Sequence, residues 1–171
     1  MNEDNFQKRL GRGMTVLGWI VVLVIFSVYF SRYLDQQNNP NQTVSTSQTN
    51  DYKQVPLQRN RYGHYVASGM INKAKVVFII DTGATDISIP EKIAQKLRLK
   101  PGIKIPVHTA NGQIDVYATT LDRVSLGEIV LHNISANINP YMQGEEVLLG
   151  MSFLRHLDFS QQGEQLLIRQ Y

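Results

Sequence analysis

The 171-residue sequence predicts a mainly β domain of barrel-like architecture, preceded by one transmembrane helix. From residue 52 onward, short β-branched and aromatic runs alternate with turn residues, and only two short stretches have helical character. Ahead of them, residues 13–31 contain no charged side chain. The chain also has no cysteine, which excludes disulfides, thiol catalysis and cysteine-type zinc sites.

The uncharged segment 13–31 has about the length that a helix needs to cross a bilayer. A cleaved signal peptide is the alternative, but no small-residue cleavage site follows the segment. Lys8, Arg9 and Arg12 precede it, while only Arg32 lies close behind. The positive-inside rule therefore predicts a cytoplasmic N-terminus, residues 1–12, and an extracytoplasmic remainder.

Residues 32–51 are predicted to be a flexible polar linker. Within them, residues 35–50 hold 13 Gln, Asn, Ser or Thr residues and a single aliphatic one, Val44. A segment of this composition cannot bury enough apolar surface to form a core. We therefore expect the folded domain to comprise residues 52–171.

Charge and histidine content argue against two classes of partner. Residues 51–171 carry 13 Lys and Arg against 11 Asp and Glu, without a basic stripe, so we expect no nucleic-acid partner. The four histidines are scattered without metal-ligand spacing, so we expect neither a metal nor another cofactor.

The predicted elements of the domain follow in chain order. A first hairpin is formed by residues 62–70 and 75–80. A second hairpin surrounds Ala110-Asn111-Gly112, because Asn-Gly is a strong hairpin signal. Two short helices are predicted, the first with a proline at its start. The strands are 62–70, 75–80, 87–89, 107–109, 113–117, 119–126, 129–138, 147–149 and 165–169, and the helices are 90–97 and 150–156.

Asp81 is the candidate reactive group. The run Val76–Ile80 predicts a strand buried on both faces, and Asp81-Thr82-Gly83 follows where the backbone leaves the core. A carboxylate at such a point can be held in a partly dry, hydrogen-bonded setting. The alternative is an ordinary strand-to-turn connection in which the Asp81 side chain bonds its own backbone.

These residues, together with two later features, resemble the retropepsin-like aspartic proteases. The matching pieces are Ile79 to Ala84, the Asn-Gly hairpin in the place of the flap, and Leu148-Leu149-Gly150 before a helix. The resemblance covers about residues 60–170 and is strongest to membrane-anchored bacterial members. It implies a closed β-barrel half with a flap hairpin and a short C-terminal helix.

The resemblance also implies roles for individual residues. Asp81 would be catalytic, with Thr82, Gly83 and Ala84 supporting the loop that carries it. Ala110, Asn111 and Gly112 would form the flap over the substrate, and Leu148, Leu149 and Gly150 would support the site from the second motif. Two carboxylates must share one proton to act as acid and base. Because this chain offers one such loop, an active enzyme must be a homodimer.

Three departures from the family pattern are visible. The pepsin-like relatives usually have Ser where this chain has Ala84, so we expect an optimum nearer weakly acidic to neutral pH. Retroviral members have Asp and Arg at the positions of Thr85 and Met151, where an ion pair braces the dimer. Without that pair, we expect the apolar strand 166–168 to serve as an unpaired interface edge.

The expected function is therefore that of a membrane-anchored, homodimeric aspartic endopeptidase. It would act on protein or peptide substrates in the periplasm of a bacterium, held by residues 13–31 in the inner membrane. Two alternatives remain open: a non-catalytic peptide-binding dimer on the same fold, and an interaction domain in which Asp-Thr-Gly is coincidental.

Overall fold

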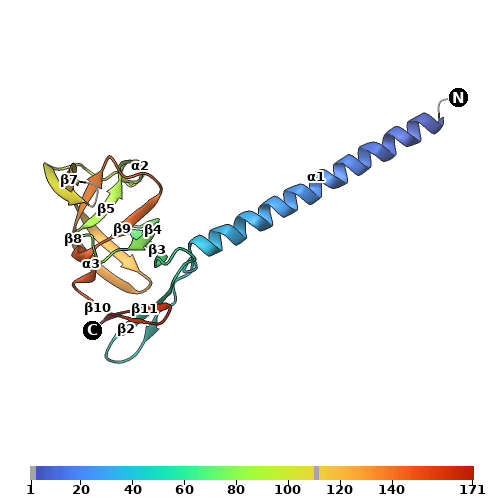
Figure 1. Ribbon diagram of the computed structural model, residues 1–171. Coiled ribbons are helices and arrows are strands. Elements are labelled where there is room, and N and C mark those ends of the chain that lie inside the picture. Colours follow the sequence, from blue (N-terminus) through green and yellow to red (C-terminus); the bar gives the residue numbers. More distant parts are fainter. Residues whose placement is uncertain (1–2, 110–111) are drawn as a thin grey trace. The chain divides into compact units, whose positions relative to one another are not determined.

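The computed structural model describes residues 3–109 and 112–171, and it divides the chain after Gln37 into two compact units. The first unit is the greater part of helix α1, Glu3–Asn38 (Figure 1). Within its segment Gly13–Asn38, the most apolar stretch of 18 residues has a mean hydropathy of 2.3, and none of that stretch is buried. By length and composition this helix could cross a membrane.

The second unit holds the other elements, and most of the predicted strands and both short helices are found in it. The strands are β1 Ser47–Gln48, β2 Lys53–Gln58, β3 Val66–Ile71, β4 Ala74–Ile80, β5 Ile87–Pro90, β6 Lys104–Thr109, β7 Gly112–Leu126, β8 Ile129–Asn139, β9 Glu146–Leu149, β10 Asp158–Gln162 and β11 Gln165–Gln170; the helices are α2 Glu91–Lys96 and α3 Met151–Leu154.

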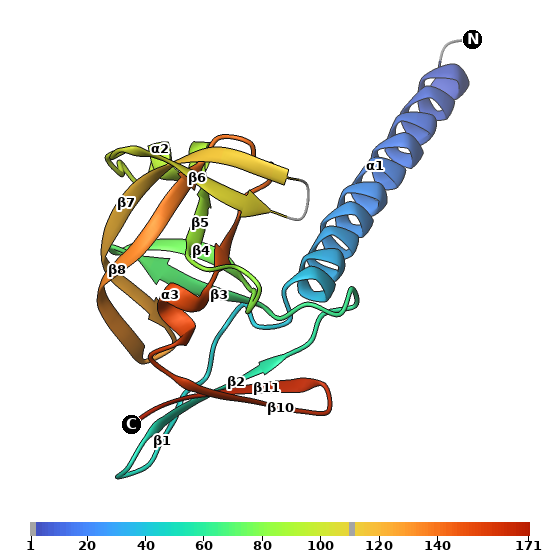
Figure 2. The same cartoon turned by 60° about the vertical axis from the view of Figure 1, so that its left-hand side comes forward.

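Seven strands form one sheet in the order β3-β4-β9-β5-β8-β7-β6, and β3 also pairs with β7. This extra pairing closes six of the strands into a barrel, while β6 extends from it as a hairpin with β7 (Figure 2). The predicted mainly β, barrel-like fold with a short C-terminal helix is thus confirmed.

The core fills the barrel with aliphatic and aromatic side chains. Phe78 of β4 and Phe153 of α3 are fully buried there. Along β4, however, Val77 and Ile79 are only half-buried. The predicted burial of this strand on both faces is therefore wrong, because one face of β4 points into the barrel and the other stays partly open.

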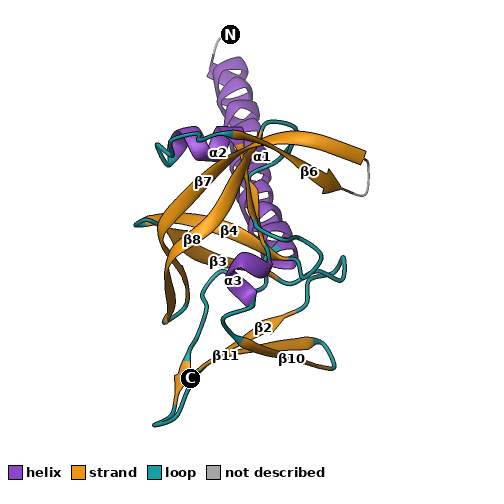
Figure 3. Cartoon of the chain, turned by 90° about the vertical axis from the view of Figure 1, so that its left-hand side faces the viewer, coloured by secondary structure: helices purple, strands orange, loops and turns teal. Residues whose placement is uncertain are grey.

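A second sheet has the strand order β1-β2-β11-β10 (Figure 3). The prediction of an unpaired edge at residues 166–168 is wrong, since β11 lies between β2 and β10 and these three residues are buried. Both flanking strands were missed. Residues 53–58 have only a short apolar alternation, Val55 and Leu57, which Pro56 interrupts. Residues 158–162 are entirely exposed and mostly polar, so they show no apolar strand pattern.

The predicted flexible linker also differs from the structure. Asn39 and Asn41 are buried, and the Asn41 amide donates to the carbonyl oxygens of Val66 (2.7 Å) and Gln58 (2.9 Å). Its side-chain oxygen accepts the Gln58 N–H at 2.8 Å. We call residues 39–48 the N-terminal strap. It docks through side-chain amides, which the lack of apolar residues in this stretch does not reveal.

Candidate active site

Asp81 follows the last residue of β4 and is half-buried, while Thr82 and Gly83 are exposed. The Asp81 N–H donates to the Leu149 carbonyl at 3.2 Å, and the Asp81 carbonyl accepts the Ala84 N–H at 3.3 Å. The first bond ties the loop to β9 and the second closes a turn. The loop thus leaves the core at Asp81 with its backbone held on both sides.

The Asp81 carboxylate turns back onto its own loop. Its Oδ1 accepts the Gly83 N–H at 2.9 Å. A Cβ at position 83 would lie 3.2 Å from the same oxygen, closer than most such contacts. Glycine therefore permits the approach that orients the carboxylate. The alternative predicted for Asp81, a side chain bonding its own backbone turn, describes this contact equally well.

The second motif lies directly beside the Asp81 loop. Strand β9 pairs in parallel with β4, with Leu149 opposite Ile80. Gly150 then passes so close to the loop that a Cβ there would lie 2.3 Å from the Asp86 carbonyl oxygen and 2.6 Å from that of Ala84. The two predicted motifs, 65 and more residues apart in the sequence, are therefore one structural unit in the fold.

Backbone groups of α3 brace the loop where the family's ion pair is missing. The Met151 N–H donates to the Ala84 carbonyl and the Ser152 N–H to the Thr85 carbonyl, each at 2.8 Å. Neither bond requires a particular side chain. Thr85 and Met151 therefore help to hold the loop against α3 through their backbone groups and not through their side chains.

Two polar contacts near the loop escaped the sequence analysis. Ser152, which is buried, accepts the Ile87 N–H on its Oγ at 3.0 Å. The carboxylate of Asp86 accepts the Ser135 hydroxyl at 3.1 Å. Asp86 follows Asp81 by five residues and could have been noticed as a second acid of the loop. Ser135 carries no signal, because its partner lies 49 residues away.

The predicted flap corresponds to the hairpin of β6 and β7. Two of its predicted tip residues, Ala110 and Asn111, lie outside the described residues. The third, Gly112, has φ +112°, and its carbonyl accepts the Thr109 hydroxyl at 2.8 Å. Lys104 and Asp115 form an ion pair of 2.9 Å between the two strands, and the hydrogen bond and charge of Asp115 raise the pKa of Lys104.

In the part of the chain that the structure describes, no group of three His, Cys, Asp or Glu side chains could hold a metal ion. A single carboxylate cannot at the same time take a proton from the attacking water, as a base, and give a proton to the leaving group, as an acid.

This fold and this loop are those of a retropepsin-like aspartic protease, and comparisons with known proteins agree. The family described as "gag-polyprotein putative aspartyl protease" matches residues 67–156. A retropepsin-like aspartic protease from Rickettsia conorii has a similar crystal structure, with a TM-score of 0.56 and 28% identity over 75% of this chain and 95% of that one. The chain belongs to the retropepsin-like aspartic protease family.

Two similar sequences carry no assigned function. An uncharacterized protein from the cobV 5′ region of a Sinorhizobium species is 29% identical, over 90% of this chain and 71% of its own length. An uncharacterized protein of Rickettsia prowazekii is 30% identical over 69% of this chain, and the match spans about half of that relative, 52%.

Proposed function

We propose that this protein is a membrane-anchored aspartic endopeptidase that hydrolyses peptide bonds of extracytoplasmic proteins as a homodimer. The observation that carries the proposal is the Asp81 loop, which is held by Gly83 and by the Leu149 carbonyl in a fold of the aspartic protease family. In the proposed reaction, the two Asp81 carboxylates of a dimer lie on either side of one water. One takes a proton from the water as it attacks the peptide carbonyl, and the other protonates the leaving nitrogen.

The supporting residues would then act on the geometry of the pair. Gly83 keeps one oxygen of each Asp81 oriented through its N–H, which leaves the other oxygen for water. The Thr82 hydroxyl, which is exposed, would donate to the loop of the second subunit. The hairpin of β6 and β7 would close over an extended substrate through backbone hydrogen bonds.

A homodimer needs a surface that can join two copies, and the β10 edge supports this part of the proposal. All five residues of β10 are exposed, and its outer edge has no strand partner among the described residues. Phe159 adds an apolar side chain that is 40% exposed. Pairing of two β10 edges would join the four-stranded sheets of two subunits. The sequence had suggested residues 166–168, which lie in β11, for this interface.

The location of the enzyme rests on helix α1. We propose that it anchors the chain in a bacterial inner membrane, with the N-terminus in the cytoplasm and residues 38–171 in the periplasm. The long apolar segment and the basic residues before it support this orientation. Alkaline phosphatase fused after Tyr171 should be active in cells, since that enzyme folds only outside the cytoplasm. An inactive but stably expressed fusion would contradict the orientation.

Catalysis is tested with the full chain in detergent micelles and a peptide library as substrate. We expect cleavage that a statine-type inhibitor blocks and that Asp81→Asn abolishes, because an amide cannot act as the base. Asp51→Asn, at an exposed aspartate before strand β2 and outside both the loop and β10, is the matched control and should cleave normally. Inhibitor-insensitive cleavage, or activity retained in Asp81→Asn, would contradict the proposal.

A further inference from the structure

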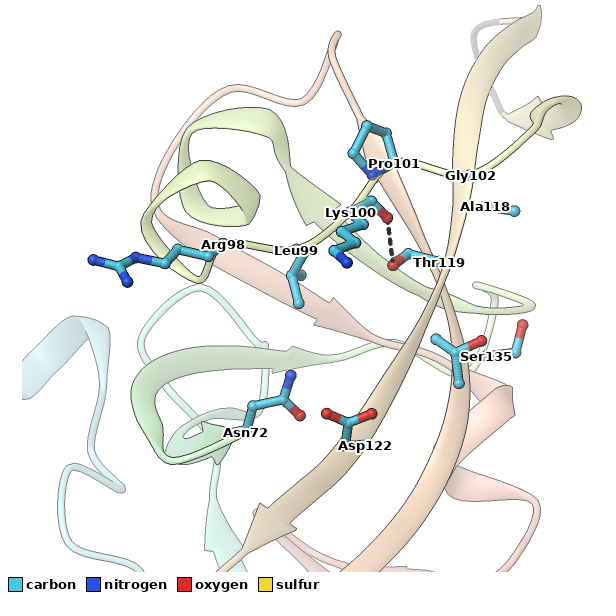
Figure 4. Close-up of a pocket in the computed structure, with 11 residues that line it drawn as sticks. Asn72, Arg98, Leu99, Lys100, Pro101, Gly102, Ala118, Thr119, Asp122 and Ser135 are labelled. Carbon is cyan, nitrogen blue, oxygen red and sulfur yellow. Dashed lines mark hydrogen bonds between the residues drawn. The ribbon is translucent and has the colours of Figure 1, made fainter.

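A cavity of about 710 Å³ opens beside strand β7 (Figure 4). Its walls come from Asn72 in the turn before β4, from the segment 98–102 after α2, from residues 118–120 and 122 of β7, and from Ser135 of β8. Asn72 precedes β4 and Asp81 follows it, so the seven residues of that strand put about 20 Å between them. The Asn72 end of the cavity therefore lies well away from Asp81, whereas its wall at Ser135 reaches Asp86, five residues after Asp81, through a hydrogen bond of 3.1 Å.

The cavity faces an interruption in the pairing of β7. On the side away from β8, the Ala118 N–H donates to the Ile103 carbonyl (2.9 Å) and the Ala118 carbonyl accepts the Gly102 N–H (2.7 Å). Further along, the Arg123 carbonyl accepts the Asn72 N–H at 2.8 Å. The edge of β7 is thus closed before and after the cavity.

Between these two closed points the edge is open at Thr120. Backbone groups in an antiparallel strand alternate in direction, so Thr120 points its N–H and C=O to the same side as Ala118 does. The alternation shifts at Asp122, which has no partner in the β7–β8 register, and Arg123 beyond it faces that side again. Within residues 3–109 and 112–171, no strand pairs with Thr120 on that side. One donor and one acceptor of the backbone therefore face the cavity.

Charged side chains of opposite sign frame this edge. Lys100 and Asp122 point into the cavity from opposite sides, whereas Arg98 points away from it (Figure 4). The two ion pairs found among the described residues involve neither Lys100 nor Asp122. The Thr119 hydroxyl donates to the Lys100 carbonyl at 3.1 Å and so fixes the backbone that carries the lysine.

We propose that this cavity is an exosite that binds an extended peptide segment by adding it to the edge of β7 at Thr120. An extended backbone supplies the acceptor and the donor that Thr120 lacks. Lys100 favours an acidic side chain on that segment, and Asp122 favours a basic one. As an exosite of the proposed endopeptidase, it would select substrate proteins by a segment remote from the cleaved bond. That use rests on the proposed function, but the binding itself does not.

The test measures binding without catalysis. Full-length Asp81→Asn protein in detergent micelles is titrated into two fluorescein-labelled, end-capped peptides of eight alternating Thr and Val residues, read by fluorescence anisotropy. One peptide carries a single glutamate and the other a single lysine. A third peptide has the sequence of the glutamate peptide but is N-methylated along its backbone, so it cannot pair with a strand edge.

The two charge variants should act in opposite directions. Lys100→Glu should weaken binding of the glutamate peptide by about three- to fivefold and strengthen that of the lysine peptide, as expected for an exposed ion pair. Asp122→Lys should do the reverse. Lys92→Glu makes the same change of net charge as Lys100→Glu at an exposed position of helix α2 and should leave both affinities unchanged.

Four results would overturn the exosite: no binding of either peptide, equal binding of the N-methylated peptide, affinities that ignore Lys100 and Asp122, or an equal effect of Lys92→Glu. Failure of the proposed enzyme looks different, because wild-type protein would then bind these peptides in the same way and cleave no substrate.

Discussion

At the scale of single residues, Gly150 is the position where the two motifs of the site constrain each other most. An added Cβ would meet two backbone carbonyl oxygens, of Asp86 at 2.3 Å and of Ala84 at 2.6 Å. Neither oxygen belongs to a flexible side chain, so the loop or α3 must shift to make room. The Asp81 loop would shift with them, because Ala84 is part of it.

We therefore expect Gly150→Ala to lower the free energy of unfolding by about 2–3 kcal/mol or more, as overpacking does in a tight core. Urea denaturation of a chain of residues 38–171, the second compact unit, measures it. Gly163→Ala is the control: its φ is +61° in an open turn, so only backbone strain of about 1 kcal/mol applies. Equal losses in the two variants would show that the close approach at Gly150 is not the cause.

Ala84 is the residue that should set the pH range of the proposed enzyme. The Asp81 carboxylate receives the Gly83 N–H, and Ala84 has no hydroxyl to add a second donor. A hydrogen-bond donor stabilises an ionised carboxylate relative to its protonated form. Ala84→Ser should therefore shift the acidic limb of the pH profile of kcat/KM downward, by about one pH unit at most.

The wild-type profile itself should peak at weakly acidic to neutral pH. Ala84→Gly, which adds no hydroxyl, controls for altered packing and should leave the acidic limb in place. An upward shift in Ala84→Ser, or equal shifts in both variants, would contradict the role of the missing donor.

At the scale of secondary structure elements, the sequence predicted those elements that carry an apolar pattern or turn residues. The strand before Asp81, the strand at Ile87 and the hairpin of β6 and β7 have both signals, and the structure contains all of them. Strand β2 offers only Val55 and Leu57 on either side of Pro56, and β10 offers Phe159 as its one apolar residue before the turn at Gly163. They become strands because β11 pairs with them on both sides, and such a tertiary effect overrides local propensity.

The candidate site divides in the same way. Asp81 and Leu149-Gly150 could be predicted from the sequence because each belongs to a short sequence motif. The fold brings the two motifs together through the parallel pairing of β4 and β9. The brace by Met151 and Ser152 could not, since it uses backbone N–H groups that every residue except proline carries.

Strand β10 is the element on which we expect dimerisation to depend. A charge placed on an exposed strand edge opposes pairing with a second chain. Phe159→Lys should therefore weaken the dimer by about tenfold or more, because it also removes an apolar contact worth up to a few kcal/mol. Analytical ultracentrifugation of a chain of residues 38–171 measures the change.

Cleavage should fall in parallel at low protein concentration and return when the concentration is raised. Tyr62→Lys, at an exposed aromatic residue outside β10, is the matched control and should dimerise normally. A Phe159→Lys protein that dimerises as tightly as wild type would place the interface elsewhere.

At the scale of the whole molecule, the N-terminal strap changes how the domain is delimited. Sequence composition placed its start at residue 52, but the compact unit begins at Asn38. Only residues 32–38 then separate the predicted span from the docked strap. We expect this short connection to restrict the proposed enzyme to substrates near the membrane, or to its own neighbours, more tightly than a flexible linker would.

The strap should also be needed for stability. A soluble chain of residues 51–171 lacks Asn41, whose side chain makes three hydrogen bonds to Gln58 and Val66, and lacks the Thr46 hydroxyl that accepts the Glu128 N–H at 2.9 Å. Without the strap, buried backbone groups of β2 and β3 lose their partners. We expect its Tm to lie at least about 5 °C below that of a chain of residues 38–171, by calorimetry. Within the longer chain, Asn41→Ala should account for much of this loss and exposed Gln42→Ala for almost none. Equal Tm values for the two chains would mean that the strap lies on the domain without stabilising it.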